Sequence, residues 1–546
     1  MVKTILMTVA ALALAAPGSA AAARFAVGLE PGAARGDVAR ELRAATGGTV
    51  SSLAPFGLVL RAPNARGVAS VNGVRYVERI RDDRRIAFVP TDPLAIKQWY
   101  LPQIRAFDAW TVQPPFDSRV RVAVIDSGID ATHPDLAPRI ESGKSFVEGP
   151  WNKDAHGHGT FVAGIIAAEA GNGEGIAGIG LGADLLVAKV VRDDGTISLE
   201  AEARAIRWAV RQDARVINLS FGGVRDPGNP KRDTYSRLEA EAIEWAVRHG
   251  VVVVAAVGNG DQAPRMPWSY ASYPAALPHV IGVSALARDG SVPAFSNRDA
   301  RYNDIAAPGV EIFSTLPKAM TSQRSTCAFQ GYSECGPIEF KKAEGTSFAA
   351  PQVSAAAALL LNLEPELEPE QVSNLLTRSA HDATPVSGCS RCTFDRDRYT
   401  GWGRLDVAAA IDALKEGPVF GLDAYEPNDD AGARAWPIGR GRSQILATVD
   451  YWDDRADVYR VDLSLGETLR ASVRGPAGTD MNLVLWKPGV RRIGAPASRQ
   501  LRAAQSVRPG AVESVQYRAP QAGRYFVQVS MRQEGAGAYS LRLERL

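Results

Sequence analysis

Three short segments of the chain carry an aspartate, a histidine and a serine in patterns that could do acyl-transfer chemistry. They are Val-Ala-Val-Ile-Asp126-Ser-Gly, His156-Gly-His158-Gly-Thr160 and Gly345-Thr-Ser347-Phe-Ala-Ala-Pro351. A serine hydroxyl is a poor nucleophile at neutral pH, so it needs an imidazole to take its proton and a carboxylate to orient that imidazole. Each residue alone has an ordinary structural explanation, since Asp-Ser-Gly forms turns and a serine commonly caps a helix. The combination predicts a nucleophilic serine with its base and orienting acid.

The elements expected around these residues would bring them to one place. Asp126 directly follows the apolar run 120–125, which is typical of a parallel strand buried on both faces. His158 and Ser347 stand at the starts of apolar helices predicted over 160–168 and 347–361. Because open α/β sheets carry their sites at the carboxyl ends of strands, we expect the three side chains to meet there.

Three patterns divide the 546-residue chain, which is too long for one ordinary core. Residues 24–90 combine short strands with one helix and predict a small α+β unit. Residues 91–420 alternate apolar strand runs, at 120–125, 185–191, 216–219 and 251–257, with helical stretches at 199–212 and 238–248. This alternation predicts an α/β domain with a doubly wound parallel sheet. Period-two alternation at 459–463, 469–473, 525–529 and 539–543 predicts an antiparallel β-sandwich over 421–546.

The extended motifs around the three residues resemble those of the subtilase family, the subtilisin-like serine proteases. The resemblance is carried by Val-Ile-Asp126-Ser-Gly-Ile-Asp, His158-Gly-Thr-x-Val-Ala-Gly164 and Gly345-Thr-Ser347-x-Ala-Ala-Pro351. The order Asp, His, Ser is also that of subtilisins. The resemblance implies that His158, and not the neighbouring His156, is the base, because only His158 fits the register of the motif. The implied activity is hydrolysis of peptide bonds through an acyl-enzyme.

The same resemblance implies further site residues that are ambiguous alone. Asn259, in Val257-Gly-Asn-Gly260, would donate its side-chain amide to the oxyanion, although a strand followed by Gly-Asn-Gly is also a plain turn. Substrate-binding roles would fall on Ser220, Phe221 and Gly222 as a strand-pairing edge and on Ala255 and Ala256 as a wall of the primary specificity pocket. The segment 268–274 would add the pocket floor. The sequence contains no clear acidic cluster that demands a basic substrate residue, so we expect a broad apolar or aromatic preference.

The ends of the chain predict export and processing. Residues 1–23 have a positive start, a short apolar run and a small-residue end, which are typical of a signal peptide. Residues 24–90 resemble the inhibitor-type propeptides of secreted subtilisins, and residues 421–546 resemble the pre-peptidase C-terminal domain of secreted proteases. We therefore expect a secreted proenzyme whose propeptide is an intramolecular inhibitor.

Charge and hydropathy exclude some partners. The 62 Lys and Arg against 60 Asp and Glu leave a net charge of +2, which gives no indication of a nucleic-acid partner. No segment after the signal is long and apolar enough to span a membrane. We expect a monomer that acts on protein or peptide substrates.

Four cysteines form two local pairs, Cys327 with Cys335 and Cys389 with Cys392. On an exported chain this pattern favours two short-loop disulfides. A metal site built on Cys-Ser-Arg-Cys is the alternative, but it would need the distant pair brought close.

The catalytic chemistry expected here needs no cofactor, but structural calcium is possible. Two oxygen-rich clusters could bind it, Asp423/Glu426/Asn428/Asp429/Asp430 and Asp450/Asp453/Asp454/Asp457. Acidic loops of β-domains are also commonly just solvated.

Two other functions fit parts of the sequence. A secreted binding or adhesion protein would use the C-terminal sandwich to hold its target. A secreted esterase is disfavoured, because Gly345-x-Ser347-x-Ala349 lacks the second glycine of a nucleophile elbow and the order of the three residues is different.

Overall fold

A computed structural model describes residues 23–30, 32–53, 57–62, 65, 67–79, 90–111, 119–321, 331–333, 343–394, 396–416, 425, 428–432, 435–440, 444–451, 454–493, 496–533 and 535–546. The chain divides into two compact units, residues 1–86 and 87–546. The predicted signal segment lies outside the described residues apart from Ala23, the first residue of strand β1. Cys327, Cys335, Asp423, Glu426 and Asp453 also lie outside them.

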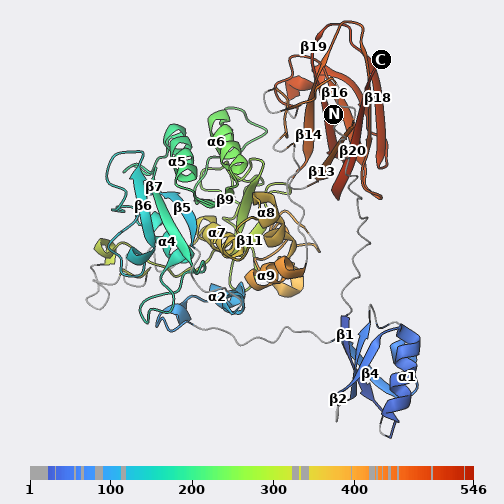
Figure 1. Ribbon diagram of the computed structural model, residues 1–546. Helices are drawn as coiled ribbons and strands as arrows, with labels where there is room; N and C mark the ends of the chain where they lie inside the picture. The colour runs from blue at the N-terminus through green and yellow to red at the C-terminus, as the bar shows by residue number, and fades with distance from the viewer. Residues whose placement is uncertain are drawn as a thin grey trace, which may run out of the picture. The chain divides into compact units, whose positions relative to one another are not determined.

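The first unit is a four-stranded antiparallel sheet covered by helix α1 (Arg35–Thr46) (Figure 1). Its strands, in the order β2-β3-β1-β4, are β1 (Ala23–Leu29), β2 (Thr49–Leu53), β3 (Gly57–Ala62) and β4 (Val74–Arg79). Val27, Leu42 and Leu60 form its core. The edge strand β2 was not predicted, because four of its five residues are exposed and leave no apolar alternation to detect.

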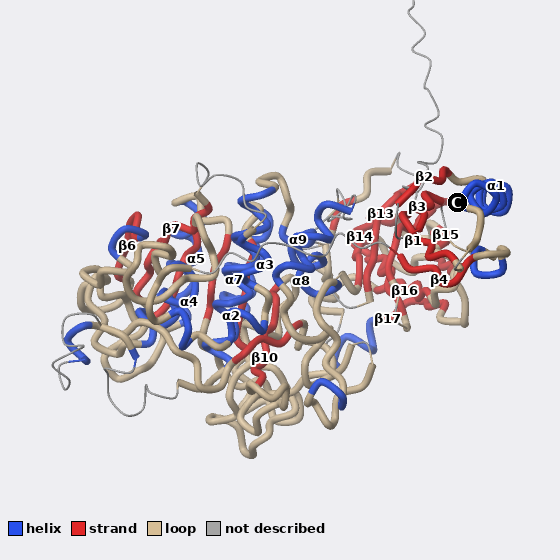
Figure 2. The backbone as a smooth tube through the Cα atoms, turned by 90° about the horizontal axis from the view of Figure 1, so that it is seen from below, coloured by secondary structure: helices blue, strands red, loops and turns tan. Residues whose placement is uncertain are grey.

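A seven-stranded parallel sheet, in the order β11-β10-β9-β8-β5-β7-β6, organises the large domain. Its strands are β5 (Val120–Asp126), β6 (Ile140–Ser145), β7 (Ala183–Lys189), β8 (Val216–Leu219), β9 (Val252–Ala256), β10 (Val280–Leu286) and β11 (Ile305–Pro308). Strands β8, β9, β10 and β11 are buried at every residue, which explains their continuous apolar runs. Figure 2 shows helices of this domain beside the strands of its sheet.

Helices cover both faces of this sheet. Alternate residues of β5 enter different cores: Val122 and Val124 pack with α4 and α7, whereas Ala123 and Ile125 pack with α5 and α6. The helices are α2 (Tyr100–Gln103), α3 (Ala106–Trp110), α4 (His158–Ala167), α5 (Leu199–Arg211), α6 (Arg237–Arg248), α7 (Thr346–Leu363), α8 (Pro369–Arg378) and α9 (Val407–Glu416). The predicted doubly wound α/β fold is confirmed.

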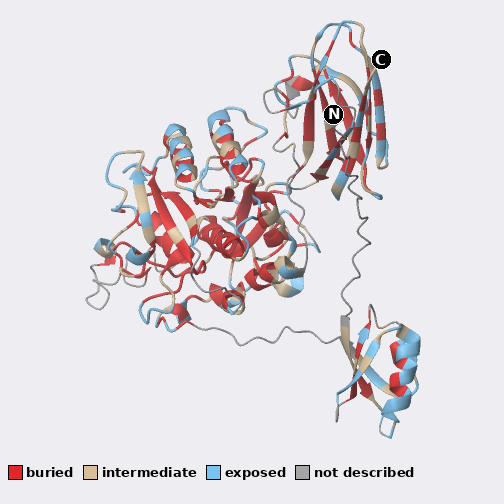
Figure 3. Ribbon diagram, in the orientation of Figure 1, coloured by how far each residue is buried: buried red, intermediate tan, exposed pale blue. Residues whose placement is uncertain are grey.

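Helix α7 is the central helix of the domain (Figure 3). It is long and apolar enough to cross a membrane, but 89% of it is buried inside the protein. Its hydropathy therefore reflects its place in the core.

The C-terminal region consists of two packed sheets, as predicted. One has the order β12-β14-β19-β16-β17 and the other β13-β20-β15-β18. Their strands are β12 (Trp436–Pro437), β13 (Gln444–Asp450), β14 (Ala456–Leu463), β15 (Thr468–Arg474), β16 (Met481–Trp486), β17 (Arg502–Ser506), β18 (Val512–Arg518), β19 (Gly523–Met531) and β20 (Ala536–Arg545). Inward side chains of both sheets, among them Tyr459, Leu483 and Leu541, share one core. Every strand pair is antiparallel except the short β12 with β14.

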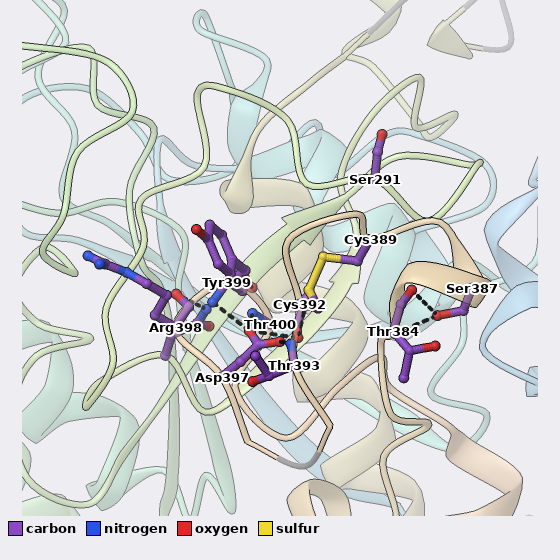
Figure 4. Close-up of a disulfide and its surroundings, with 12 residues drawn as sticks. Ser291, Thr384, Ser387, Cys389, Cys392, Thr393, Asp397, Arg398, Tyr399 and Thr400 are labelled. Carbon is purple, nitrogen blue, oxygen red and sulfur yellow. Dashed lines mark hydrogen bonds between the residues drawn. A yellow bond between two sulfur atoms is a disulfide. The ribbon is translucent and has the colours of Figure 1, made fainter.

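A disulfide joins Cys389 to Cys392, whose Cα atoms are 5.4 Å apart (Figure 4). The loop that follows is organised by Asp397, whose carboxylate accepts hydrogen bonds from the backbone N–H groups of Tyr399 and Thr400. Because the sulfur atoms of Cys389 and Cys392 are bonded to each other, they are not available to ligate a metal ion.

Candidate active site

Asp126 is the last residue of β5 and is 1% exposed. The His158 Nδ1 atom lies 2.8 Å from Asp126 Oδ1 and 3.0 Å from Asp126 Oδ2. Asp126 Oδ1 also accepts the backbone N–H of Ser127 at 2.7 Å. A carboxylate at this place accepts the Nδ1–H of a neutral imidazole, which leaves Nε2 as the nitrogen that can take a proton.

His158 is the first residue of α4, and two glycines allow it to reach Asp126. Gly157 adopts a left-handed conformation with φ 86° at the helix N-cap, a conformation that L side chains rarely adopt. A Cβ atom added to Gly159 would lie 2.2 Å from the carbonyl oxygen of Gly128, so a side chain there would push α4 away from the end of β5.

Asp154, which was not predicted as a site residue, organises the segment that leads into α4. Its carboxylate accepts hydrogen bonds from the backbone N–H groups of His156, Gly157 and Thr160, at 3.1, 2.8 and 2.9 Å. It also accepts the hydroxyls of Ser127 and Thr160. These bonds satisfy the N–H groups of the N-cap Gly157 and of Thr160 in the first helical turn, and the Ser127 hydroxyl accepts that of Gly159. Residues 154–160 have the composition of a polar loop. Only the position of Asp154 shortly before the start of the helix could have indicated this cap.

The electrostatics around His158 favour its protonated form. Burial alone would lower the pKa of the imidazole, but the charge and the hydrogen bond of Asp126, with the charge of Asp154, raise it above its ordinary value. His156 is exposed, and its ring centroid lies 6.2 Å from that of His158. His158 and not His156 therefore makes the carboxylate contact.

Ser347 lies in the first turn of α7, beside residues that touch His158. The ring of Phe348 lies 5.5 Å from the His158 ring and 4.6 Å from the ring of Phe161, centroid to centroid. The backbone carbonyl of Ser347 accepts the Ser220 hydroxyl at 2.8 Å. Among the described residues, no hydrogen bond joins the Ser347 hydroxyl to His158, and such contacts commonly tighten when substrate binds.

Asn259 follows β9 and faces the start of α7. Its Oδ1 atom accepts the backbone N–H and the hydroxyl of Thr346, each at 2.9 Å. Because a backbone N–H can only donate, the amide oxygen must face Thr346 and the amide NH₂ must face the other way. That NH₂ has no protein acceptor among the described residues, so it is available to a ligand.

Comparison with known proteins assigns this arrangement to a family. A family model for Peptidase_S8, the subtilase family, matches residues 117–403. The chain belongs to the subtilase family. It is a subtilisin-like serine endopeptidase, a hydrolase.

Curated relatives agree with this membership. Thermitase of Thermoactinomyces vulgaris is 33% identical over 328 residues, which cover 59% of this chain and 99% of thermitase. The major intracellular serine protease of Bacillus subtilis (strain 168) is 38% identical over 254 residues, covering 45% of this chain and 70% of that protein. Subtilisin E of the same organism is 33% identical over 311 residues, covering 56% and 72%.

A cleft of about 480 Å³ in this subtilase is lined by Ser347 and Asn259. Three of the five predicted substrate-binding residues line it as well, Phe221, Gly222 and Ala256. Trp268, Ser272 and Tyr273, from the segment predicted as a pocket floor, are also part of its wall.

The other two predicted substrate-binding residues lie elsewhere. Ser220 is 2% exposed, and its hydroxyl accepts from the Asn218 side chain and donates to the Ser347 carbonyl. Ala255 is fully buried and packs in the core under α5 and α6, because successive residues of β9 face opposite sides of the sheet. Ala256, one residue on, faces the cleft.

The acidic side chains proposed for calcium mostly have protein partners. Asp429 contacts His279 Nε2 at 2.9 Å, and Asp450 accepts from Arg378 at 2.9 Å. Asp457 accepts the hydroxyl of Tyr539. Within the described part of the chain, no group of three or more His, Cys, Asp or Glu side chains is arranged to hold a metal ion. Asp429, Asp450 and Asp457 are therefore engaged within the protein, whereas Asp423, Glu426 and Asp453 lie outside the described residues.

Proposed function

We propose that the chain is a secreted serine endopeptidase, made as a proenzyme, in which Asp126, His158, Ser347 and Asn259 carry out acyl transfer. The observation that carries this proposal is the bond between His158 Nδ1 and the buried Asp126 carboxylate. It sets the tautomer in which Nε2 can act as a base. Relatives that share the family are serine proteases by name.

In the proposed reaction, His158 Nε2 takes the proton of the Ser347 hydroxyl, and Oγ attacks the carbonyl carbon of the substrate peptide. Asp126 keeps the imidazole oriented and stabilises the imidazolium. His158 then gives the proton to the leaving amine, which departs as the acyl-enzyme forms. Water repeats the cycle with His158 as base and releases the acid.

The oxyanion that forms in each step carries negative charge on the former carbonyl oxygen. Asn259 can donate its side-chain amide to that oxygen, since its own oxygen is already held by Thr346. The backbone N–H of Ser347, in the first turn of α7, is the second proposed donor.

We propose that the N-terminal unit is the propeptide and inhibitor, and that removal of it after export activates the enzyme. The unit supports this proposal by having its own sheet, helix and core, so it can fold as a separate body. The catalytic chemistry needs no cofactor, and we expect the mature enzyme to act as a monomer. A structural calcium ion elsewhere stays a prediction that a melt with and without chelator would test.

Expression of the full chain and of its Ser347→Ala variant tests the proposal. We expect the wild-type protein to lose its N-terminal unit, to hydrolyse peptides and to react with a serine-directed phosphonate. The Ser347→Ala variant should keep the unit and do neither. Mass spectrometry reports both cleavage and labelling, and a processed, peptide-cleaving Ser347→Ala protein would contradict the assignment.

A further inference from the structure

Two glutamates in the wall of the cleft that holds Ser347 take no part in the mechanism above. Glu202, in the first turn of α5, and Glu239, in the first turn of α6, line the same cleft as Ser347 and Asn259. They are only 3% and 4% exposed, so two carboxyl groups are almost completely removed from bulk water. Carboxyl groups are rarely buried to this extent without a partner.

Among the described residues, one oxygen of each glutamate has no hydrogen-bond donor. Glu202 Oε1 and Glu239 Oε2 are buried and receive no hydrogen bond from a protein donor. The two carboxyl groups hydrogen-bond to each other, which requires a shared proton since carboxylates only accept. Each group is thus the other's partner while the cleft is empty.

The charged residues of the cleft wall are all acidic. Of its lining residues, all of which are described, the charged ones are Glu202, Glu239 and Asp261, and no lysine or arginine is among them. Two arginines in the first turns of the same helices or just after them are engaged elsewhere: Arg204 pairs with Glu200 and Arg237 with Glu241, at exposed positions. A cation for the pair would have to come with a ligand.

We propose that Glu202 and Glu239 form an acidic subsite that selects a lysine or arginine side chain of the peptide substrate. This inference rests on the proposed function, because it places the cation in the cleft that also holds the reacting serine. A cationic side chain would supply the missing donors and would let both carboxylates ionise together. A neutral residue of similar length would leave them unpartnered.

The ionisation of the pair agrees with an empty cation site. Burial raises the pKa of Glu239 to about 7, and burial, the charge of Glu239 and their hydrogen bond raise the pKa of Glu202 well above its ordinary value. The helix N-termini of α5 and α6, at which the two glutamates stand, favour the ionised form, and Asp261, the other charged residue of the wall, is exposed. Selectivity for a cationic residue should therefore weaken as the pH falls below neutrality.

A positional-scanning peptide library tests the proposal on the processed enzyme. At one substrate position we expect lysine or arginine to be preferred over norleucine, measured as the ratio of kcat/KM values. Glu202→Gln and Glu239→Gln, which keep shape and remove charge, should each reduce that ratio about 10- to 100-fold. Asp261→Asn, the third and exposed carboxyl of the wall, is the matched control and should change it little.

The measurements separate failure of this inference from failure of the proposed function. Labelling of Ser347 by the serine-directed phosphonate in both glutamine variants shows that they fold and that the proposed catalytic residues are intact. The ratio should also fall with decreasing pH in the wild type, while titration of His158 cancels because it affects both peptides. An active enzyme without a cationic preference, or with a preference unchanged in the variants, overturns this inference alone. A wild-type enzyme inactive on every peptide overturns the proposed function and this inference with it.

Discussion

Two pairs of buried carboxyl groups, Asp126 with Asp154 and Glu202 with Glu239, differ in how their negative charge is compensated. At the end of β5, Asp126 accepts hydrogen bonds from Ser127 and His158, and Asp154 nearby accepts five. At the first turns of α5 and α6, Glu202 and Glu239 have only each other. The first arrangement is complete in the protein alone, and the second is not.

The difference shows what each set of carboxylates is suited to do. A carboxylate whose lone pairs are filled by protein donors is fixed in place, so it can orient a neighbouring group such as an imidazole. A buried carboxyl pair without donors costs stability, and it gains most from a ligand that brings positive charge. The four predictions below test that contrast.

The largest effect is expected for Asp126→Asn. The change keeps the shape but replaces an acceptor facing His158 Nδ1 by an amide that can donate, so the wrong tautomer is favoured. We expect kcat to fall about 10⁴-fold, the loss known for the equivalent change in chymotrypsin-type enzymes. Peptide hydrolysis by processed enzyme measures it, with Glu200→Gln, at an exposed position of α5, as the control that should stay near wild type. A loss below tenfold would show that the His158–Asp126 bond is not what orients the base.

Asp154→Ala should have the next largest effect, on folding. It leaves the backbone N–H groups of His156, Gly157 and Thr160 without their acceptor, and we expect the free energy of unfolding to drop by about 2–4 kcal/mol. Urea unfolding in a Ser347→Ala background, which prevents self-digestion, gives the value. Asp261→Asn, an exposed carboxyl, should lie within about 0.5 kcal/mol of its parent. Equal free energies of unfolding for the two variants would show that Asp154 does not stabilise the start of α4.

Whereas loss of Asp154 should destabilise the fold, removal of the two glutamate carboxyl groups should stabilise it. Because the folded pKa values are raised, the folded state binds more protons than the unfolded state between about pH 4.5 and pH 7, so stability falls as pH rises through this window. The double change Glu202→Gln with Glu239→Gln, again in the Ser347→Ala background, should raise the melting temperature more at about pH 8 than at about pH 5. An equal rise at both pH values would argue that the pair is not buried with a shared proton.

The smallest effect concerns the loss of peptidase activity at low pH. Asp126 and Asp154 raise the pKa of His158 above 6.5, and only the neutral imidazole can take the serine proton, so activity should be lost as pH falls through that raised value. For a norleucine peptide we expect the midpoint of kcat/KM above about pH 6.5 and unmoved by the glutamine variants. A midpoint that shifts with Glu239→Gln would mean that the two charge systems are coupled.

The proposed catalytic residues and many of the main elements could be predicted from sequence because each lies in a local pattern. Asp126 ends an apolar run, and His158 and Ser347 begin apolar helices, so short-range periodicity places all three. Strand β2 was missed because four of its five residues are exposed and give no apolar alternation. Ala255 shows the limit within a strand: the segment was predicted, but which alanine faces the cleft depends on the register of β9.

The contact between Glu202 and Glu239 could not be predicted from the local sequence of either helix. Ser236-Arg-Leu-Glu239 has the spacing of a capping box, and both glutamates stand in first turns, where a carboxylate normally favours the helix dipole. In the structure, Ser236 caps α6 but Glu239 turns to Glu202 instead of to the N-cap. Nothing in either helix alone indicates this meeting, so the sequence predicted no acidic subsite.

By itself, the sequence determined the family and the layered fold and indicated the proposed reacting side chains, because each depends on residues close together in the chain. The tertiary structure alone decided which groups compensate one another: Asp154 with the turn into α4, Thr346 with Asn259, and Glu202 with Glu239. The physical reason is that hydrogen bonding and burial of charge depend on distance in space. Two carboxyl groups in separate helices became a single site only when α5 and α6 packed side by side on the sheet.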